Sequence, residues 1–162
     1  HPVQAPRLAV RGVLVLCDSS AGAVLVVDGG GGSTDLDWLS KRGDTFVLED
    51  MSGHQVAKIK ERALHVRDTM SIDLDGRSAT VKKALVGLRD RYHVEVDGGD
   101  DLKVHGNIVD HEYEIEQSGD TVAEVSKKWF RVRDTYGVEV QPGADIPLIL
   151  SVVVAIDAMA RD

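Results

Sequence analysis

Residues 57–70 read AKIKERALHVRDTM, and similar phrases return at 79–92 (ATVKKALVGLRDRY) and at 123–136 (AEVSKKWFRVRDTY). The Arg-Asp pairs within these phrases begin at positions 67, 89 and 133, which are 22 and then 44 residues apart. The period is therefore 22 residues, with one degenerate unit between the second and third copies. A fixed period near this length indicates one supersecondary unit that is copied several times along the chain.

Each copy is predicted to be a β-hairpin. In the second half of a unit the apolar residues alternate with polar ones, as Tyr92, Val94 and Val96 do with His93 and Glu95. A period of two with one polar face indicates an antiparallel strand that covers a core on one side only. The first half of each unit holds a shorter strand of the same kind, and turn residues separate the units at 75–76, 97–99 and 118–120.

Three further segments complete the series. Residues 44–48 match the second strand of a unit whose first strand no longer resembles the repeat. Residues 102–104 and 110–115 are predicted to form the two strands of the degenerate unit. Two apolar runs within residues 8–27 are predicted to form a first hairpin. Six hairpins predict about twelve strands. We expect a disordered N-terminal tail at residues 1–7 and one mainly β domain over residues 8–162, which is long enough for a single core.

The C-terminal segment, residues 145–160, breaks the pattern and is predicted to be a helix. Asp145 is a favourable N-cap, and Pro147 falls in the first turn, where its missing N–H is harmless. The helix would be apolar on nearly every side and must therefore be buried in protein or in lipid. At about 1.5 Å per residue it spans roughly 24 Å, which is short of the roughly 30 Å hydrocarbon core of a bilayer. The β-branched run at 152–154 leaves a strand open as an alternative.

The hairpins and the helix together predict a closed antiparallel barrel of about twelve strands with the hydrophobic helix through its centre. A barrel of about eight strands fills its interior with side chains, whereas about twelve strands leave room for a helix roughly 10–12 Å wide. Closure removes the edges of the sheet, and enclosure removes the helix from water. A membrane anchor is the alternative way to bury this helix.

Composition excludes some classes of function. The 162 residues carry a formal net charge of −8, which argues against a nucleic-acid binder whose affinity depends on neutralising phosphates. Cys17 is the single cysteine, so no intrachain disulfide can form, and a reducing, cytoplasmic location is favoured. Cys17 lies in an apolar run, which favours a buried thiol over a nucleophile.

Residues 104–115 (VHGNIVDHEYEI), residues 125–138 (VSKKWFRVRDTYGV) and the terminal apolar helix ending IDAM at 156–159 resemble the LURP-one-related family. That family is grouped with the tubby C-terminal domain and the phospholipid scramblases, and the resemblance implies a twelve-stranded barrel around a central C-terminal helix. The resemblance covers residues 43–159. Residues 1–42 depart from it, because a glycine run at 29–32 replaces a tighter connection and residues 35–39 do not read as the expected strand.

The resemblance implies little chemistry. Plant members are associated with defence responses, and tubby domains with phosphoinositide binding at the plasma membrane. No catalytic motif is common to the group, so no catalytic residue and no cofactor carries over. The sequence itself contains neither a P-loop after residues 29–32 nor a nucleophile elbow around its serines. We therefore expect a protein that is not an enzyme.

Two groups of polar residues invite a functional interpretation, and a structural one is favoured for both. The recurring Arg-Asp pairs are expected to hold turns and neighbouring hairpins together, with a ring of ligand-binding arginines as the alternative. Neighbouring residues of a strand point to opposite faces, so His111 and Glu112 cannot easily bind one ion. No metal site is therefore predicted from the group of acidic residues and histidines at 105–114, which are His105, Asp110, His111, Glu112 and Glu114.

Basic residues recur near the end of the first strand of each unit, and they are the remaining candidates for a binding site. We predict that they gather on one rim of the barrel and bind anionic lipid head groups, giving peripheral association at the inner membrane face without a transmembrane span. The structural alternative is that these Lys and Arg residues only protect strand ends. Two functional alternatives are a protein-interaction or scaffold barrel without lipid contact, and a barrel that holds a small hydrophobic ligand beside the helix. The candidate residues are Lys58, Lys60, Lys82, Lys83, Lys127, Lys128 and Arg131.

Overall fold

A computed structural model describes most of the chain. The described residues are 13–17, 23–28, 36–42, 45–50, 54–61, 69–83, 91–126, 135–141 and 143–160. The predicted tail at 1–7 and the three recurring Arg-Asp pairs lie outside these residues, so both predictions stay open.

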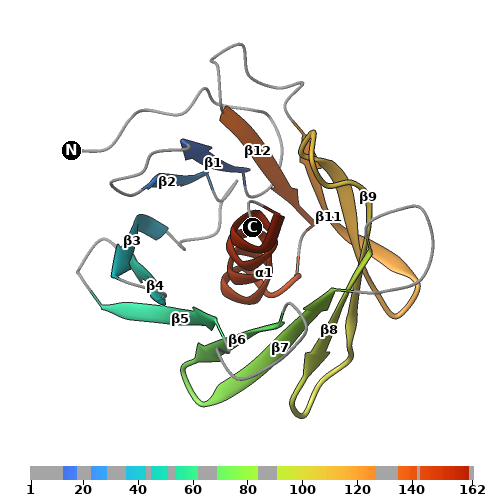
Figure 1. Cartoon of the computed structure of the whole chain (residues 1–162), viewed down its shortest axis with the longest axis horizontal. Helices are drawn as coiled ribbons and strands as arrows, with labels where there is room; N and C mark the ends of the chain where they lie inside the picture. Colours follow the sequence, from blue (N-terminus) through green and yellow to red (C-terminus); the bar gives the residue numbers. More distant parts are fainter. Residues whose placement is uncertain are drawn as a thin grey trace.

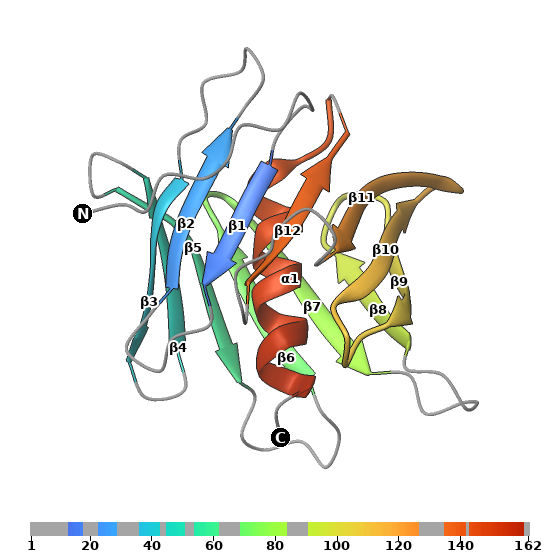
Figure 2. The same ribbon diagram turned by 90° about the horizontal axis from the view of Figure 1, so that it is seen from above.

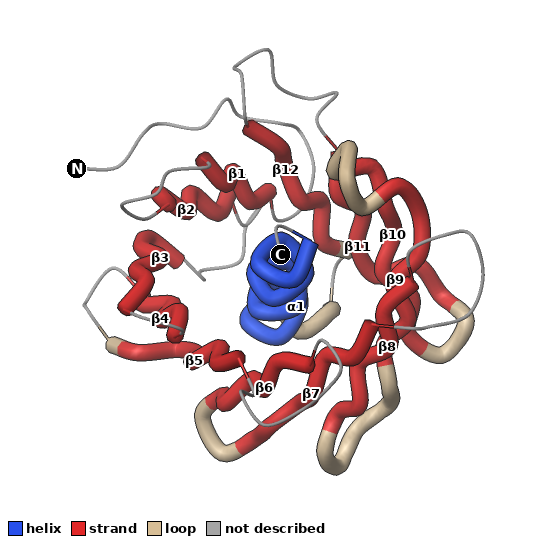
Figure 3. The backbone as a smooth tube through the Cα atoms, in the orientation of Figure 1, coloured by secondary structure: helices blue, strands red, loops and turns tan. Residues whose placement is uncertain are grey.

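Antiparallel strands surround one C-terminal helix (Figure 1). Each strand pairs with its neighbours in the sequence, and β1 pairs with β12, so the hydrogen-bonded order closes into a barrel (Figure 3). The mainly antiparallel β architecture is thus the one predicted from the alternating pattern. The strands are β1 (Val13–Cys17), β2 (Ala23–Asp28), β3 (Leu36–Arg42), β4 (Thr45–Asp50), β5 (Gln55–Glu61), β6 (Thr69–Leu74), β7 (Arg77–Lys83), β8 (Arg91–Val96), β9 (Leu102–Asn107), β10 (Glu112–Gln117), β11 (Asp120–Ser126) and β12 (Thr135–Val140).

The alternation in the sequence matches the alternation in burial. In β6, Met70, Ile72 and Leu74 are buried, whereas Ser71 is half-buried and Asp73 is exposed. The same pattern recurs in β8 and β10, because successive side chains of a strand point to opposite faces. The inward-facing set forms one core with the helix.

The strand β3 corrects one expectation. The sequence pattern at residues 35–39 does not predict a strand. In the structure, however, β3 spans Leu36–Arg42 and pairs with β4 along its length. The register shifts between Leu36 and Trp38, which absorbs the irregular start of the strand. Pairing with β2 adds contacts at Ala23 and Val24, so hydrogen bonding to both neighbours overrides the weak local pattern.

The helix α1 (Ile146–Ala160) lies in the middle of the ring of strands and runs along it (Figures 1 and 2). Its residues 148–156 are all buried, which is why an element that is apolar on nearly every side is stable here. The helical prediction is therefore right and the alternative of a strand at 152–154 is wrong. Ser151 is the buried polar residue of the helix, and its hydroxyl donates to the Pro147 carbonyl at 2.7 Å.

The start of α1 is fixed to the barrel wall. The Leu148 N–H donates to the Asp145 carboxylate at 3.3 Å, and the Ile149 N–H donates to the Asp145 carbonyl at 3.0 Å, so Asp145 is the N-cap. The Arg77 guanidinium at the start of β7 binds the same carboxylate through both terminal nitrogens. This side-chain hydrogen bond raises the pKa of Arg77.

The barrel has two distinct ends. Because every neighbouring pair is antiparallel, all odd-numbered strands run in one direction. Arg77, at the start of β7, binds Asp145 at the start of α1. At the other end of the helix, Nδ1 of His111, in the turn after β9, lies 4.0 Å from Oδ1 of Asp157. The odd-numbered strands therefore end where α1 ends, at what we call the α1 C-terminal end (Figure 2). Among the described residues, no helix combines the length and the hydropathy needed to cross a membrane.

Candidate functional site

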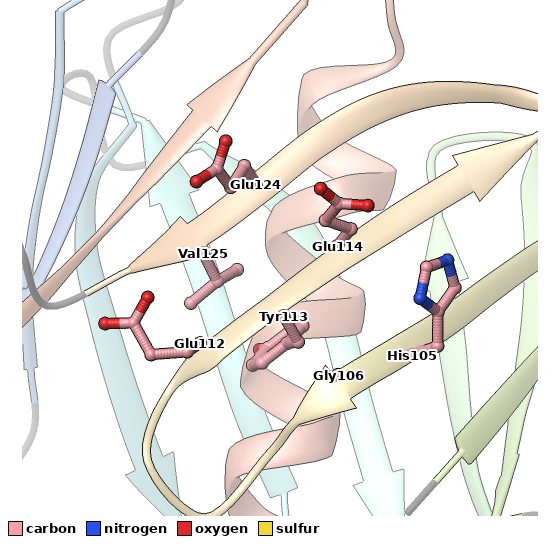
Figure 4. A pocket seen from close by; sticks show the side chains of 7 residues that line it. All are labelled: His105, Gly106, Glu112, Tyr113, Glu114, Glu124 and Val125. Atoms are coloured by element: carbon pink, nitrogen blue, oxygen red, sulfur yellow. The ribbon is translucent and has the colours of Figure 1, made fainter.

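The outer face of β9, β10 and β11 carries a shallow depression of about 260 Å³ (Figure 4). Val104, Tyr113 and Ile115 point into the core, so the residues that alternate with them face outward. The residues that line the depression are His105, Gly106, Glu112, Tyr113, Glu114, Glu124 and Val125.

Register brings three outward side chains of β9 and β10 together. Glu114 lies directly across from His105, and Glu116 is the next outward residue of β10. One ligand atom from each of the three side chains lies within 4.8 Å of the others, and His105 Nε2 is 3.1 Å from Glu116 Oε1. We call His105, Glu114 and Glu116 the His-Glu-Glu cluster. An imidazole and two carboxylates in this arrangement can bind a divalent transition metal.

Two irregularities of the backbone shape this face. Gly106 has a φ of 134° and lies opposite Tyr113, and a Cβ at this position would lie 2.7 Å from the Glu112 carbonyl oxygen. Only glycine fits there without displacing β10. The register between β10 and β11 shifts between Ile115 and Glu116, a bulge of the kind that redirects side chains.

Acidic residues form a row across this face. Glu114 lies opposite Glu124 of β11, and Glu124 lies opposite Glu139 of β12. Like charges directly opposite one another on neighbouring strands are destabilising. A cation bound beside this row would relieve part of that repulsion.

The other residues of the sequence-predicted acidic group have separate partners. Asp110 accepts a hydrogen bond from Asn107 at 2.7 Å, Glu112 accepts one from Ser126 at 2.7 Å, and His111 faces Asp157. His111 and Glu112 thus do not face one site, as predicted. His105 and Glu114 do come together, which the sequence interpretation did not anticipate.

The pattern along one strand does not show which residues lie opposite it on the next strand. His105 and Glu114 occupy outward positions on the two arms of one hairpin, and Glu116 is the next position of the same parity. Counting outward from the 108–111 turn would have placed all three on one face. Glu116 lies beyond the group at 105–114, one outward position further along β10 than Glu114.

Tyr113, beneath the depression, is almost fully buried. Burial raises the pKa of Tyr113 well above its usual value, and the nearby Asp157 and Tyr92 raise it further. The phenol therefore stays protonated in the folded protein at neutral pH and contributes no charge to the core.

The described basic candidates lie on β5 and β7. Lys60 is exposed near the end of β5, and Lys82 and Lys83 end β7, so all three lie toward the α1 C-terminal end. Lys82 Nζ is 2.9 Å from Glu95 Oε1, which offsets its charge, and Lys58 lies in the middle of β5 opposite Asp73. The remaining candidates, Lys127, Lys128 and Arg131, lie outside the described residues.

The geometry defines a class of protein, namely an antiparallel β barrel of consecutive hairpins that encloses its own C-terminal helix. The LURP-one-related family model matches residues 7–157, and this chain belongs to that family. The structure is similar to the X-ray structure of a protein from Arabidopsis thaliana, with a TM-score of 0.67 and 18% sequence identity over 93% of this chain and 91% of that chain. At this identity the likeness shows the fold alone. No curated protein matches the chain.

Proposed function

We propose that this protein is a non-enzymatic barrel that binds anionic phospholipid at a membrane surface through its α1 C-terminal end. The observation that carries the proposal is the common direction of β5, β7 and β9. Because these strands share one direction, Lys60 near the end of β5 and Lys82 and Lys83 at the end of β7 lie toward the same end as the turn after β9. Val109 in that turn is 72% exposed, so this end of the barrel also presents an apolar side chain.

The expected binding is weak and depends on salt. A basic residue close to an anionic surface contributes roughly 1 kcal/mol, and this contribution falls off within a Debye length. Lys82 contributes less than Lys60 because Glu95 already pairs with it. The net charge of −8 opposes binding overall, so the proposal requires this end of the barrel to face the membrane. A cytoplasmic location at the inner membrane face follows from this proposal.

Liposome flotation tests the proposal. We expect the protein to float with vesicles that contain phosphatidylserine at low salt, to float less at physiological salt, and not to float with phosphatidylcholine alone. Lys60→Glu should reduce flotation severalfold, since reversing one charge removes one attraction and adds one repulsion.

Lys103→Glu is the matched control. Lys103 is exposed like Lys60 but lies near the start of β9, toward the opposite end of the barrel, and its reversal changes the net charge by the same amount. Equal losses in both variants would indicate an effect of overall charge. Protein that stays unbound in every condition would contradict the proposal and favour a protein-interaction barrel instead.

A further inference from the structure

We propose that the His-Glu-Glu cluster is a binding site for a divalent transition metal, with Zn²⁺ as the best-matched ion. The site lies on the outer wall of β9 and β10, uses none of the residues that carry the lipid proposal, and does not depend on that proposal.

The geometry comes from the regular pairing of a hairpin. A residue directly across from another has its Cβ about 4.5–5.5 Å away, and the diagonal neighbour is within reach of long side chains. Glu114 is the direct neighbour of His105, and Glu116 is its diagonal neighbour. The three ligand atoms lie within 4.8 Å of one another, so a single ion can contact all three after small side-chain rotations.

Carboxylates on the neighbouring strands add negative charge on the Glu114 side of the cluster. Glu114 is the cluster residue that continues into the acidic row, through Glu124 to Glu139. On the other flank Lys103 lies opposite Glu116, and Arg91 lies opposite His105. These two basic residues lie on the side of the cluster away from the acidic row. The cluster therefore lies between the acidic row and the two basic residues.

The donor set determines the class of metal. Imidazole nitrogen suits Zn²⁺ and Ni²⁺, whereas Ca²⁺ and Mg²⁺ prefer oxygen ligands alone. Three protein ligands on an open surface leave further positions for water. Two carboxylates and one neutral imidazole carry a charge of about −2, which matches a divalent ion.

Isothermal titration of the metal-stripped full chain with ZnCl₂ tests the proposal, with CaCl₂ as the comparison. We expect one Zn²⁺ site and much weaker binding of Ca²⁺. His105→Ala and Glu116→Gln should each raise the Kd for Zn²⁺ at least about tenfold, because even outer-shell partners of metal ligands are worth 10–100-fold in affinity.

The matched control is His93→Ala. His93 Nε2 lies 3.2 Å from Asp101 Oδ2, almost the same spacing as in the His105–Glu116 pair, but these two residues have no third ligand grouped with them among the described residues. Its Zn²⁺ affinity should equal that of the wild type. Ni²⁺ provides a second readout, since its paramagnetism should broaden the amide NMR signals of residues 103–107 and 112–117 before all others.

Two results would overturn the proposal. One is the absence of Zn²⁺ binding by the wild-type protein. The other is unchanged Zn²⁺ affinity in a His105→Ala protein whose thermal unfolding in EDTA matches the wild type, because the ion would then bind elsewhere on the chain.

Discussion

At the scale of single residues, Tyr113 is the most informative side chain, because it lies between the outer depression and the core and its phenol is held protonated. Its pKa is raised by burial and then by Asp157 and Tyr92. The unfolded chain releases this proton near pH 10, whereas the folded protein releases it only at higher pH. The contribution of the Tyr113 phenol to the free energy of unfolding is thus fully present below about pH 10. It is lost as pH rises through the interval between the pKa of the unfolded chain and the higher pKa of the folded protein.

Tyr113→Phe should remove this alkaline loss of stability. At pH 7 the variant keeps its ring in the core, so the free energy of unfolding should change by about 1 kcal/mol or less. Above about pH 10 the difference between the two proteins should shift in favour of the variant by up to about 1.4 kcal/mol per pH unit. Urea unfolding from pH 7 to 11 measures both. Parallel curves for the two proteins would show that the Tyr113 phenol ionises as easily in the folded protein as in the unfolded one.

At the scale of elements, the junction between α1 and β7 holds the helix in position. Asp145 caps the helix and also binds Arg77, so one carboxylate joins the start of the helix to the wall. Asp145→Ala should lower the free energy of unfolding by about 1–2 kcal/mol through loss of the cap.

Asp145→Asn separates the two contributions. The amide oxygen still caps the helix, while the ion pair with Arg77 is lost, and this pair is worth about 1 kcal/mol or less because the Arg77 side chain is 45% exposed. The cost should therefore be smaller than that of Asp145→Ala, and a double-mutant cycle with Arg77→Ala in urea should show coupling. An asparagine variant as unstable as the alanine variant would show that the ion pair, and not the cap, stabilises this junction.

At the scale of the whole molecule, the barrel depends on the helix that fills it. Val153 is completely buried inside the ring, and an unpaired charge there costs several kcal/mol, a large part of a typical domain stability of about 5–15 kcal/mol. Val153→Asp should therefore abolish cooperative thermal unfolding as followed by circular dichroism. Val109→Asp makes the same change at a 72% exposed position and should keep a melting temperature close to that of the wild type. A folded and soluble Val153→Asp protein would mean that the barrel is stable without a close-packed helix.

The sequence determined the elements whose signals are local. Alternation such as Tyr92-Val94 predicted the strands, and Asp145 followed by Pro147 and an apolar run predicted the start of the helix. Each of these signals depends on residues a few positions apart, where backbone geometry alone sets which side chains share a face.

Features that depend on residues distant in the chain follow only from the tertiary structure. β3 forms because β2 and β4 pair with it, β1 meets β12 across the closing seam, and His105 reaches Glu114 and Glu116 only through the register of β9 with β10. The seam and β3 gain their stability from hydrogen bonds that exist only after the chain has folded. The ligand set of the His-Glu-Glu cluster is assembled in the same way, since a pattern along one strand fixes the face of each side chain but not the residue opposite it.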